Sequence, residues 1–158
     1  MDVFDTNWLP QLEVAIKVLL AGALGGVVGF ERELAQRPAG LRTHAILAAA
    51  AALLVGLADL LVAEFATETR PVLLRVDPIR VIEAVVTGVA FLGAGTIFRH
   101  AASDVIEGLT TAASLLLVAA IGMAVGMGQL LLATLVTLLA LIVLRLVGRL
   151  GKSKGNGG

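Results

Sequence analysis

Long apolar runs separated by short charged segments are the feature that most limits how this chain can fold. A helix needs about 20 mainly apolar residues to cross a bilayer, and 58% of the 158 residues are hydrophobic. Because lipid offers no partner to a free backbone N–H or C=O group, we predict an all-α integral membrane protein, a bundle of about five transmembrane helices with Gly-rich packing faces. The predicted helices are residues 12–30, 44–62, 79–98, 108–127 and 129–147.

Composition also excludes several classes of protein. The formal net charge is zero, so the chain lacks the basic surface that nucleic-acid binding needs. The absence of Cys excludes disulfides, thiolate metal sites and a cysteine nucleophile. No set of nucleophile, base and acid indicates an enzyme, and no feature requires a cofactor. We expect one membrane domain, residues 1–148, followed by a basic, Gly-rich and disordered tail, residues 149–158.

Glycine recurs in the predicted helices at spacings that favour close packing. Two overlapping GxxxG patterns in the first helix place small residues on one face, where another backbone can approach. Packing within the chain is the common use of such faces, and a homodimer is the alternative. In the third helix, glycines can instead mark a break whose free amides and carbonyls meet an ion or substrate. The packing or pathway glycines are Gly22, Gly25, Gly26, Gly29, Gly88, Gly93, Gly95 and Gly108.

A dense group of charges separates the first two apolar runs. The first run stops at a Glu-Arg-Glu triplet, a turn around Pro38 and Gly40 follows, and Thr43 is the expected N-cap of the second helix. We predict a network in which Arg37 and Arg42 pair with Glu31 and Glu33, because charges shielded from water need partners. The alternative is a set of solvated charges. The predicted polar site comprises Glu31, Arg32, Glu33, Arg37, Arg42, Thr43, His44, Thr96, Thr110 and Thr111.

The distribution of basic residues predicts the orientation in the membrane. With five spans, eight Lys and Arg residues fall on one side and four on the other. The positive-inside rule then places the N-terminus outside and the C-terminus in the cytoplasm. In this orientation the polar site lies at the cytoplasmic face.

Local signals mark two further helix starts. Asp77 followed by Pro78 is typical of an N-cap with proline at the first helical position. Asp104, with Glu107 three residues later, resembles a capping box at the start of the fourth helix. The segment 63–76 between the second and third helices could lie in the membrane interface, but its periodicity does not decide this.

Three acids in the predicted helices are weak candidates for a metal site. Mg²⁺ prefers carboxylate and water oxygens, and Glu13, Asp59 and Glu83 all lie near helix ends on the predicted outer side. An acid near a helix end can also reach headgroup water at little cost, which we consider the better interpretation. His44 and His100 are isolated histidines without a third ligand in view, so neither indicates a metal site.

Three sequence blocks resemble the membrane domain of the MgtC/SapB family. They are GGVVGFERELAQRPAGLRTHAIL, DPIRVIEAVVTGVAFLGAGTIF and VIEGLTTAASLLLVAAIGMAVG, and the resemblance covers roughly Val14 to Gly128. It adds Asp77 and Arg80 as signature residues. The resemblance implies a bacterial cytoplasmic (inner) membrane protein linked to adaptation to low magnesium and, in pathogens, to intracellular survival. It also implies the F-type ATP synthase as a partner.

This chain departs from the family pattern in three respects. Glu107 stands where the family usually has a basic residue, and Leu116 stands where it often has tryptophan. Many members also carry a soluble C-terminal domain, which we do not expect here. We therefore predict a non-enzymatic regulator that acts through the polar cytoplasmic-face site, with the lipid bilayer and a membrane complex as partners. The alternatives are a transporter or channel for Mg²⁺ or another small ion, and a structural subunit that docks a larger complex.

Overall fold

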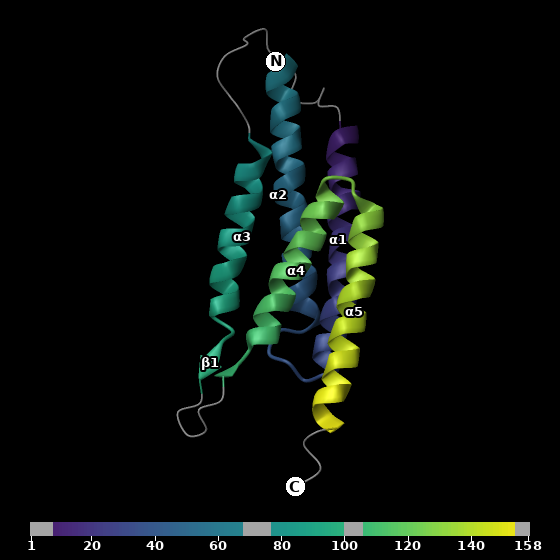
Figure 1. The fold of residues 1–158 in the computed structure, drawn as a ribbon. Helices are drawn as coiled ribbons and strands as arrows, with labels where there is room; N and C mark the ends of the chain where they lie inside the picture. Colours follow the sequence, from purple (N-terminus) through teal and green to yellow (C-terminus); the bar gives the residue numbers. More distant parts are fainter. Residues whose placement is uncertain (1–7, 68–76, 100–105, 154–158) are drawn as a thin grey trace.

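The structure is a computed structural model that describes residues 8–67, 77–99 and 106–153. Within these residues the chain forms five helices and a short antiparallel ribbon of two strands (Figure 1). The predicted all-α bundle is confirmed, since each strand contains only two residues. In chain order the elements are α1 (Leu9–Leu34), α2 (Leu41–Thr67), α3 (Pro78–Ala94), β1 (Phe98–Arg99), β2 (Ile106–Glu107), α4 (Leu109–Gly126) and α5 (Leu130–Ser153).

Consecutive helices run in opposite directions, and α4 occupies the centre of the bundle (Figure 1). α4 packs against all four other helices, α1 and α2 pair most extensively with each other, and α3 and α5 cover opposite flanks. The α1–α2 turn, the β1–β2 ribbon and the start of α4 lie at one end of the bundle, which we call the polar end. The first residue of α1 and the last residue of α5 lie at opposite ends of the bundle.

Of the described helices, three are long and apolar enough to cross a membrane: α1, α2 over Leu41–Ala63, and α4. α3 contains 17 residues, and the apolar part of α5, Leu130–Arg145, is also shorter. Large apolar side chains point away from the bundle, among them Leu19 at 73% exposure and Phe91 at 81%. Contact with lipid, rather than water, makes this exposure favourable.

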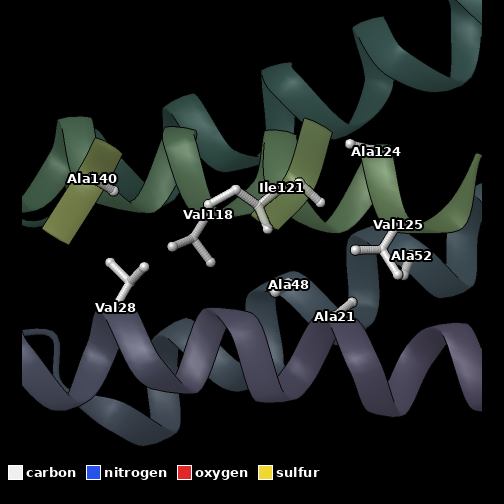
Figure 2. Packing of buried hydrophobic residues seen from close by; sticks show 10 residues of the cluster. Ala21, Val28, Ala48, Ala52, Val118, Ile121, Ala124, Val125 and Ala140 are labelled. Carbon is white, nitrogen blue, oxygen red and sulfur yellow. The ribbon is translucent and has the colours of Figure 1, made fainter. Parts of the chain in front are cut away.

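Glycines allow α2 to pack closely between α1 and α4. A Cβ on Gly25 would lie 2.6 Å from both the Cβ of Ala48 and the carbonyl oxygen of His44. From the other side, a Cβ on Gly122 would collide with the carbonyl oxygen of Ala48. Ala48 is fully buried at this three-helix contact (Figure 2). Small side chains therefore bring three backbones together at one level of the bundle.

Two clusters of small and branched apolar side chains form the core. The cluster among α1, α2, α4 and α5 includes Val28, Val118 and Ile121 (Figure 2). A second cluster includes Val89 of α3 and Leu115 of α4 and also involves α2. Because α4 contributes to both clusters from Leu115 onward, it packs against the bundle on two sides.

α1 continues one turn beyond its predicted end at residue 30. The helix closes with backbone bonds from the N–H of Gln36 to the Glu33 carbonyl, at 2.9 Å, and from the N–H of Arg37 to the Arg32 carbonyl, at 3.0 Å. Gln36 adopts the left-handed conformation, with φ 54°, and the pattern is the Schellman motif. Since Glu and Arg are good helix formers, the charged triplet does not end the helix.

α2 begins at Leu41, so the predicted N-cap at Thr43 is wrong. The N–H of Leu41 instead donates to Oε2 of Glu33, at 2.9 Å. A carboxylate in this place satisfies one of the free N–H groups of the helix and interacts favourably with the helix dipole. Local capping rules could not predict this contact, because the acid belongs to the preceding helix.

α3 begins as predicted and ends earlier than predicted. Oδ1 of Asp77 accepts from the N–H of Ile79 at 3.0 Å, which confirms the predicted N-cap. The helix stops at Ala94 rather than near residue 98. There the hydroxyl of Thr96 donates to the Gly93 carbonyl at 2.8 Å, and the chain turns into β1. The turn uses residues of low helix propensity.

The predicted capping box at α4 is wrong. Glu107 lies in β2, where it pairs with Phe98, and Asp104 lies outside the described residues. The residue before α4 is Gly108, with φ 92° and no side-chain cap. A Cβ at this position would collide with the carbonyl oxygen of Thr96. Glycine is therefore needed here, and it leaves the N-terminus of α4 without a side-chain acceptor.

α5 follows a second left-handed glycine, Gly128 with φ 77°. The helix continues to Ser153, so residues 149–153 are helical rather than part of a disordered tail. Predictions about residues 1–7, 68–76, 154–158 and His100 lie outside the described residues.

Candidate functional site

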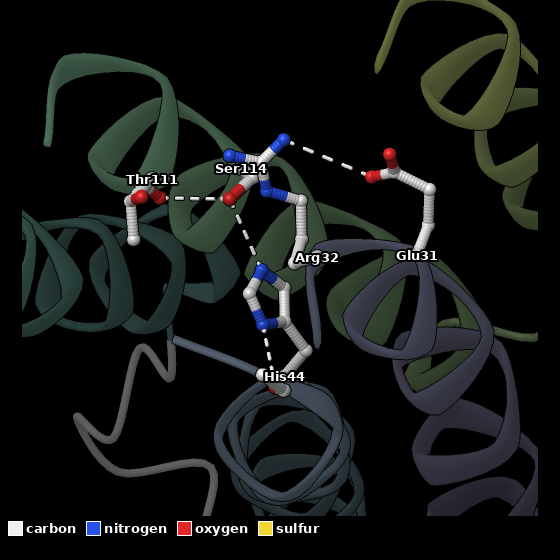
Figure 3. Close-up of polar contacts among 6 residues, drawn as sticks. Glu31, Arg32, His44, Thr111 and Ser114 are labelled. Carbon is white, nitrogen blue, oxygen red and sulfur yellow. Dashed lines mark hydrogen bonds and ion pairs between the residues drawn. The ribbon is translucent and has the colours of Figure 1, made fainter. Parts of the chain in front are cut away.

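Five polar side chains are buried together at the polar end (Figure 3). Glu31 and Arg32 come from the last turns of α1, His44 from the first turn of α2, and Thr111 and Ser114 from α4; each is less than a tenth exposed. Four of them belong to the site predicted from the sequence. Ser114 does not, although its i+3 spacing from Thr111 places it on the same helix face and could have revealed it.

His44 connects α2 to the turn that precedes it and to α4. Its Nδ1 lies 2.9 Å from the Gly40 carbonyl oxygen, and its Nε2 lies 3.0 Å from the Ser114 hydroxyl oxygen. Because a carbonyl only accepts, Nδ1 donates to Gly40, and Nε2 of the neutral ring faces the Ser114 hydroxyl, whose one hydrogen is shared between Nε2 and the Thr111 carbonyl. The same hydroxyl lies 2.8 Å from the Thr111 carbonyl oxygen. Both ring nitrogens are thus engaged with protein groups, which makes His44 a structural link between helices.

Glu31 and Arg32 form a buried but incomplete ion pair. Nη1 of Arg32 lies 3.7 Å from Oε2 of Glu31, which is too long for a hydrogen bond. Within the described part of the chain, neither this Oε2 nor Nε of Arg32 has a hydrogen-bond partner. Burial of charge is favourable only when further hydrogen bonds satisfy the remaining donors and acceptors. Arg32 therefore retains donor capacity that the described residues do not use.

The predicted pairing of Arg37 and Arg42 with Glu31 and Glu33 is wrong. Neither arginine forms an ion pair with a described acid, and both side chains are exposed. Glu31 pairs with its neighbour Arg32, and Glu33 caps α2. The physical reason is that α1 continues through the triplet: at 3.6 residues per turn, consecutive side chains point in different directions. Only part of the predicted cluster is therefore buried.

A pocket of about 270 Å³ opens at the polar end, between the α1–α2 turn, the ribbon and the start of α4. Its lining residues come from all three of the sequence blocks that resemble the MgtC/SapB family. Arg42 and Thr43 do not line it and are exposed. The polar side chains that line the pocket are Arg32, Arg37, Thr96, Glu107, Thr110 and Thr111.

The side chains that line the pocket carry a net positive charge, with Glu31 3.7 Å from Arg32 outside the lining. Two arginines line it against a single carboxylate, that of Glu107. The first residues of α4, Leu109 to Thr111, also line it. The first N–H groups of a helix have no partner within the helix, and the helix dipole places partial positive charge there. The arrangement favours an anionic group and disfavours a cation such as Mg²⁺.

The glycines of α3 lie in different environments. A Cβ on Gly93 would lie 3.4 Å from the Cβ of Ala112, so Gly93 is close to α4. A Cβ on Gly88 would meet no atom within 4 Å, and this glycine is exposed. Gly95 follows the end of the helix, next to Thr96 at the pocket. α3 thus contains one packing glycine, Gly93, and ends beside the pocket rather than breaking within its length.

The other predicted residues lie away from the pocket. Glu13 forms an ion pair with Lys17 at 2.7 Å, and Asp59 and Glu83 are exposed. Arg80 is exposed in the first turn of α3. Across residues 8–67, 77–99 and 106–153, no three His, Cys, Asp or Glu side chains are grouped as a metal site would require.

Comparison with known proteins identifies relatives along most of the chain. It is 40% identical over 136 residues to an uncharacterised protein of Haemophilus influenzae, an alignment that covers 86% of this chain and 56% of the relative. It is 34% identical over 122 residues to Protein SapB of Bacillus subtilis, covering 77% and 51%. It is 36% identical over 143 residues to the Putative magnesium transporter YhiD of Escherichia coli K12, covering 87% and 62%.

The chain therefore spans between half and two thirds of the length of these relatives. No solved structure matches it significantly. The model of the MgtC family matches residues 18–153, a range that includes the buried polar cluster and the whole lining of the pocket. With its apolar helical bundle and these relatives, the chain is a membrane protein that belongs to the MgtC family.

Proposed function

We propose that this chain is a non-enzymatic regulator of ion balance that acts through the pocket at the polar end. The observation that supports this proposal is Arg32: its guanidinium is buried at the pocket with Nε unpartnered by any described residue. A buried charge with unused donors is unfavourable unless a binding partner completes its contacts. A site that receives a ligand or a partner protein accounts for this arrangement.

A magnesium transporter is the second candidate, because one relative is named a putative magnesium transporter. The charge of the pocket argues against a cation route through it. Inward from the pocket, α1, α2 and α4 approach closely at Gly25, Ala48 and Gly122. A cation would have to pass Arg32 and then this tightly packed region.

The environment of the regulator is also part of the proposal. We place the chain in the bacterial cytoplasmic membrane with the polar end in the cytoplasm, where a soluble ligand or a membrane complex could reach the pocket. The F-type ATP synthase, the partner that the family resemblance implies, and a homodimer both remain predictions for this chain.

The experiment that separates the two functions is Mg²⁺ flux into proteoliposomes that contain the purified chain. Arg37→Gln alters the pocket, and Arg42→Gln is the matched control, because Arg42 is exposed at the same end and does not line the pocket. For a regulator we expect no dye-reported entry above that of empty liposomes. Entry that Arg37→Gln abolishes and Arg42→Gln preserves would make the chain a transporter and refute the proposal.

Co-purification tests the regulator directly. With tagged protein in native membranes, we expect the F-type ATP synthase to be retained by the parent chain and by Arg42→Gln and to be lost with Arg37→Gln. If both variants retained the ATP synthase equally, the pocket would not be the site at which this partner binds.

A further inference from the structure

We infer that the pocket at the polar end binds a phosphate-type oxyanion, held by Arg32, Arg37 and the N-terminus of α4. The inference rests on the proposed function, since it names the chemical class of the ligand at the same site. The ligand group is a phosphate, carried either by a small soluble compound or by a lipid headgroup.

The start of α4 provides the first part of the argument. α4 is an 18-residue helix whose N-cap is Gly108, a residue without a side chain to accept from the helix N–H groups. The N–H groups that lack an intrahelical partner belong to the first turn, and Leu109, Thr110 and Thr111 of that turn line the pocket. Backbone donors together with the positive end of the helix dipole form a common phosphate-binding arrangement.

Arg32 provides the second and independent part. Its side chain is only 5% exposed, its closest acid is 3.7 Å away, and Nε has no partner in the described part of the chain. A guanidinium has five N–H donors in a planar fork that matches the oxygens of a phosphate. An oxyanion in the pocket would supply the acceptors that Glu31 does not.

Arg37 and Glu107 determine how strongly the pocket attracts an anion. Both are exposed side chains that line the pocket, so substitution of either leaves the buried core intact. Arg37 adds a second positive charge beside Arg32, whereas Glu107 opposes it. The pocket volume of about 270 Å³ lies just below the range of roughly 300–1,000 Å³ typical of drug-sized ligands. It therefore fits a small anion or a headgroup.

The test measures binding of two phosphate probes to the purified full chain. One arm titrates inorganic phosphate into detergent-solubilised protein by calorimetry. The other titrates short-chain phosphatidic acid, with short-chain phosphatidylcholine as the control lipid, into the same detergent-solubilised protein. Phosphate binding in detergent identifies a soluble ligand, and binding that requires phosphatidic acid identifies a headgroup; either outcome supports the inference.

The variants then connect binding to the pocket. We expect Arg37→Gln to weaken binding about tenfold or more, as the loss of a charged hydrogen bond predicts. Arg42→Gln should leave affinity unchanged, and Glu107→Gln should increase it. Absence of binding to both probes by folded protein would overturn the inference, and so would equal affinity of the Arg37 and Arg42 variants.

The outcomes also separate this inference from the proposed function. If neither probe binds and no Mg²⁺ flux occurs, the oxyanion site is refuted while a regulator that binds another partner stands. If a probe binds through Arg37 and Mg²⁺ flux also occurs, the oxyanion site stands and the regulator is refuted.

Discussion

At the scale of single residues, the polar end divides its charges into buried and exposed groups. Glu31 and Arg32 are buried, while Glu33 caps α2 and Arg37 stands at the pocket. The sequence presents all four as one cluster. Their directions around α1 separate Glu31, Arg32 and Glu33, and Arg37 lies in the turn after that helix. His44 has two hydrogen-bond partners and is part of the scaffold that positions the pocket.

Ser114→Ala should destabilise the protein by about 1–3 kcal/mol, because it leaves Nε2 of the buried His44 without a partner. Thr134→Ala is the matched control, since Thr134 is exposed and its hydroxyl donates only to the Leu130 carbonyl in its own helix. Denaturant unfolding in detergent measures both. An equal loss of stability in the two variants would mean that His44 does not link the helices.

At the scale of helices, close packing through small residues determines where the site can form. α2 contacts α1 through Gly25 and Gly29 and contacts α4 through Gly122 and Gly126. These contacts bring His44 of α2 within reach of Ser114 of α4. Without a driving force from water between lipid-embedded helices, such packing and interhelical hydrogen bonds maintain the arrangement.

Gly122→Ala should destabilise the bundle by about 1–3 kcal/mol, because the added Cβ would meet the backbone of Ala48. Gly88→Ala is the control in α3: its Cβ would meet no atom within 4 Å, so it should be neutral or stabilising by up to about 1 kcal/mol. Thermal unfolding in detergent compares the two. A Gly122 variant as stable as the Gly88 variant would contradict the packing described here.

At the scale of the whole molecule, the alternating helices place the polar end opposite the α4–α5 turn (Figure 1). The proposed orientation puts the polar end in the cytoplasm. Because the chain contains no Cys, single cysteines can report the position of each end without removal of native ones.

Thr43→Cys marks the polar end and Gln129→Cys marks the opposite end, and both parent side chains are exposed. In intact cells we expect a membrane-impermeant maleimide to label Cys at 129 and not at 43, and permeabilisation should make both accessible. The reverse pattern would invert the orientation, and labelling of both in intact cells would exclude a membrane-spanning bundle with these ends on opposite sides.

The sequence by itself determined the helical membrane fold. Its apolar runs of about 20 residues are long enough to cross a bilayer, and in lipid a helix satisfies its own backbone hydrogen bonds. It also determined the Asp77 cap, which depends on neighbouring residues alone.

The tertiary structure decided the site at the polar end. The Glu33 cap joins two helices, and the His44–Ser114 contact joins residues 70 positions apart. The pocket exists because a left-handed Gly108 starts α4 beside Thr96 and Arg32. Contacts of this kind depend on how helices pack, a property that local sequence patterns do not contain.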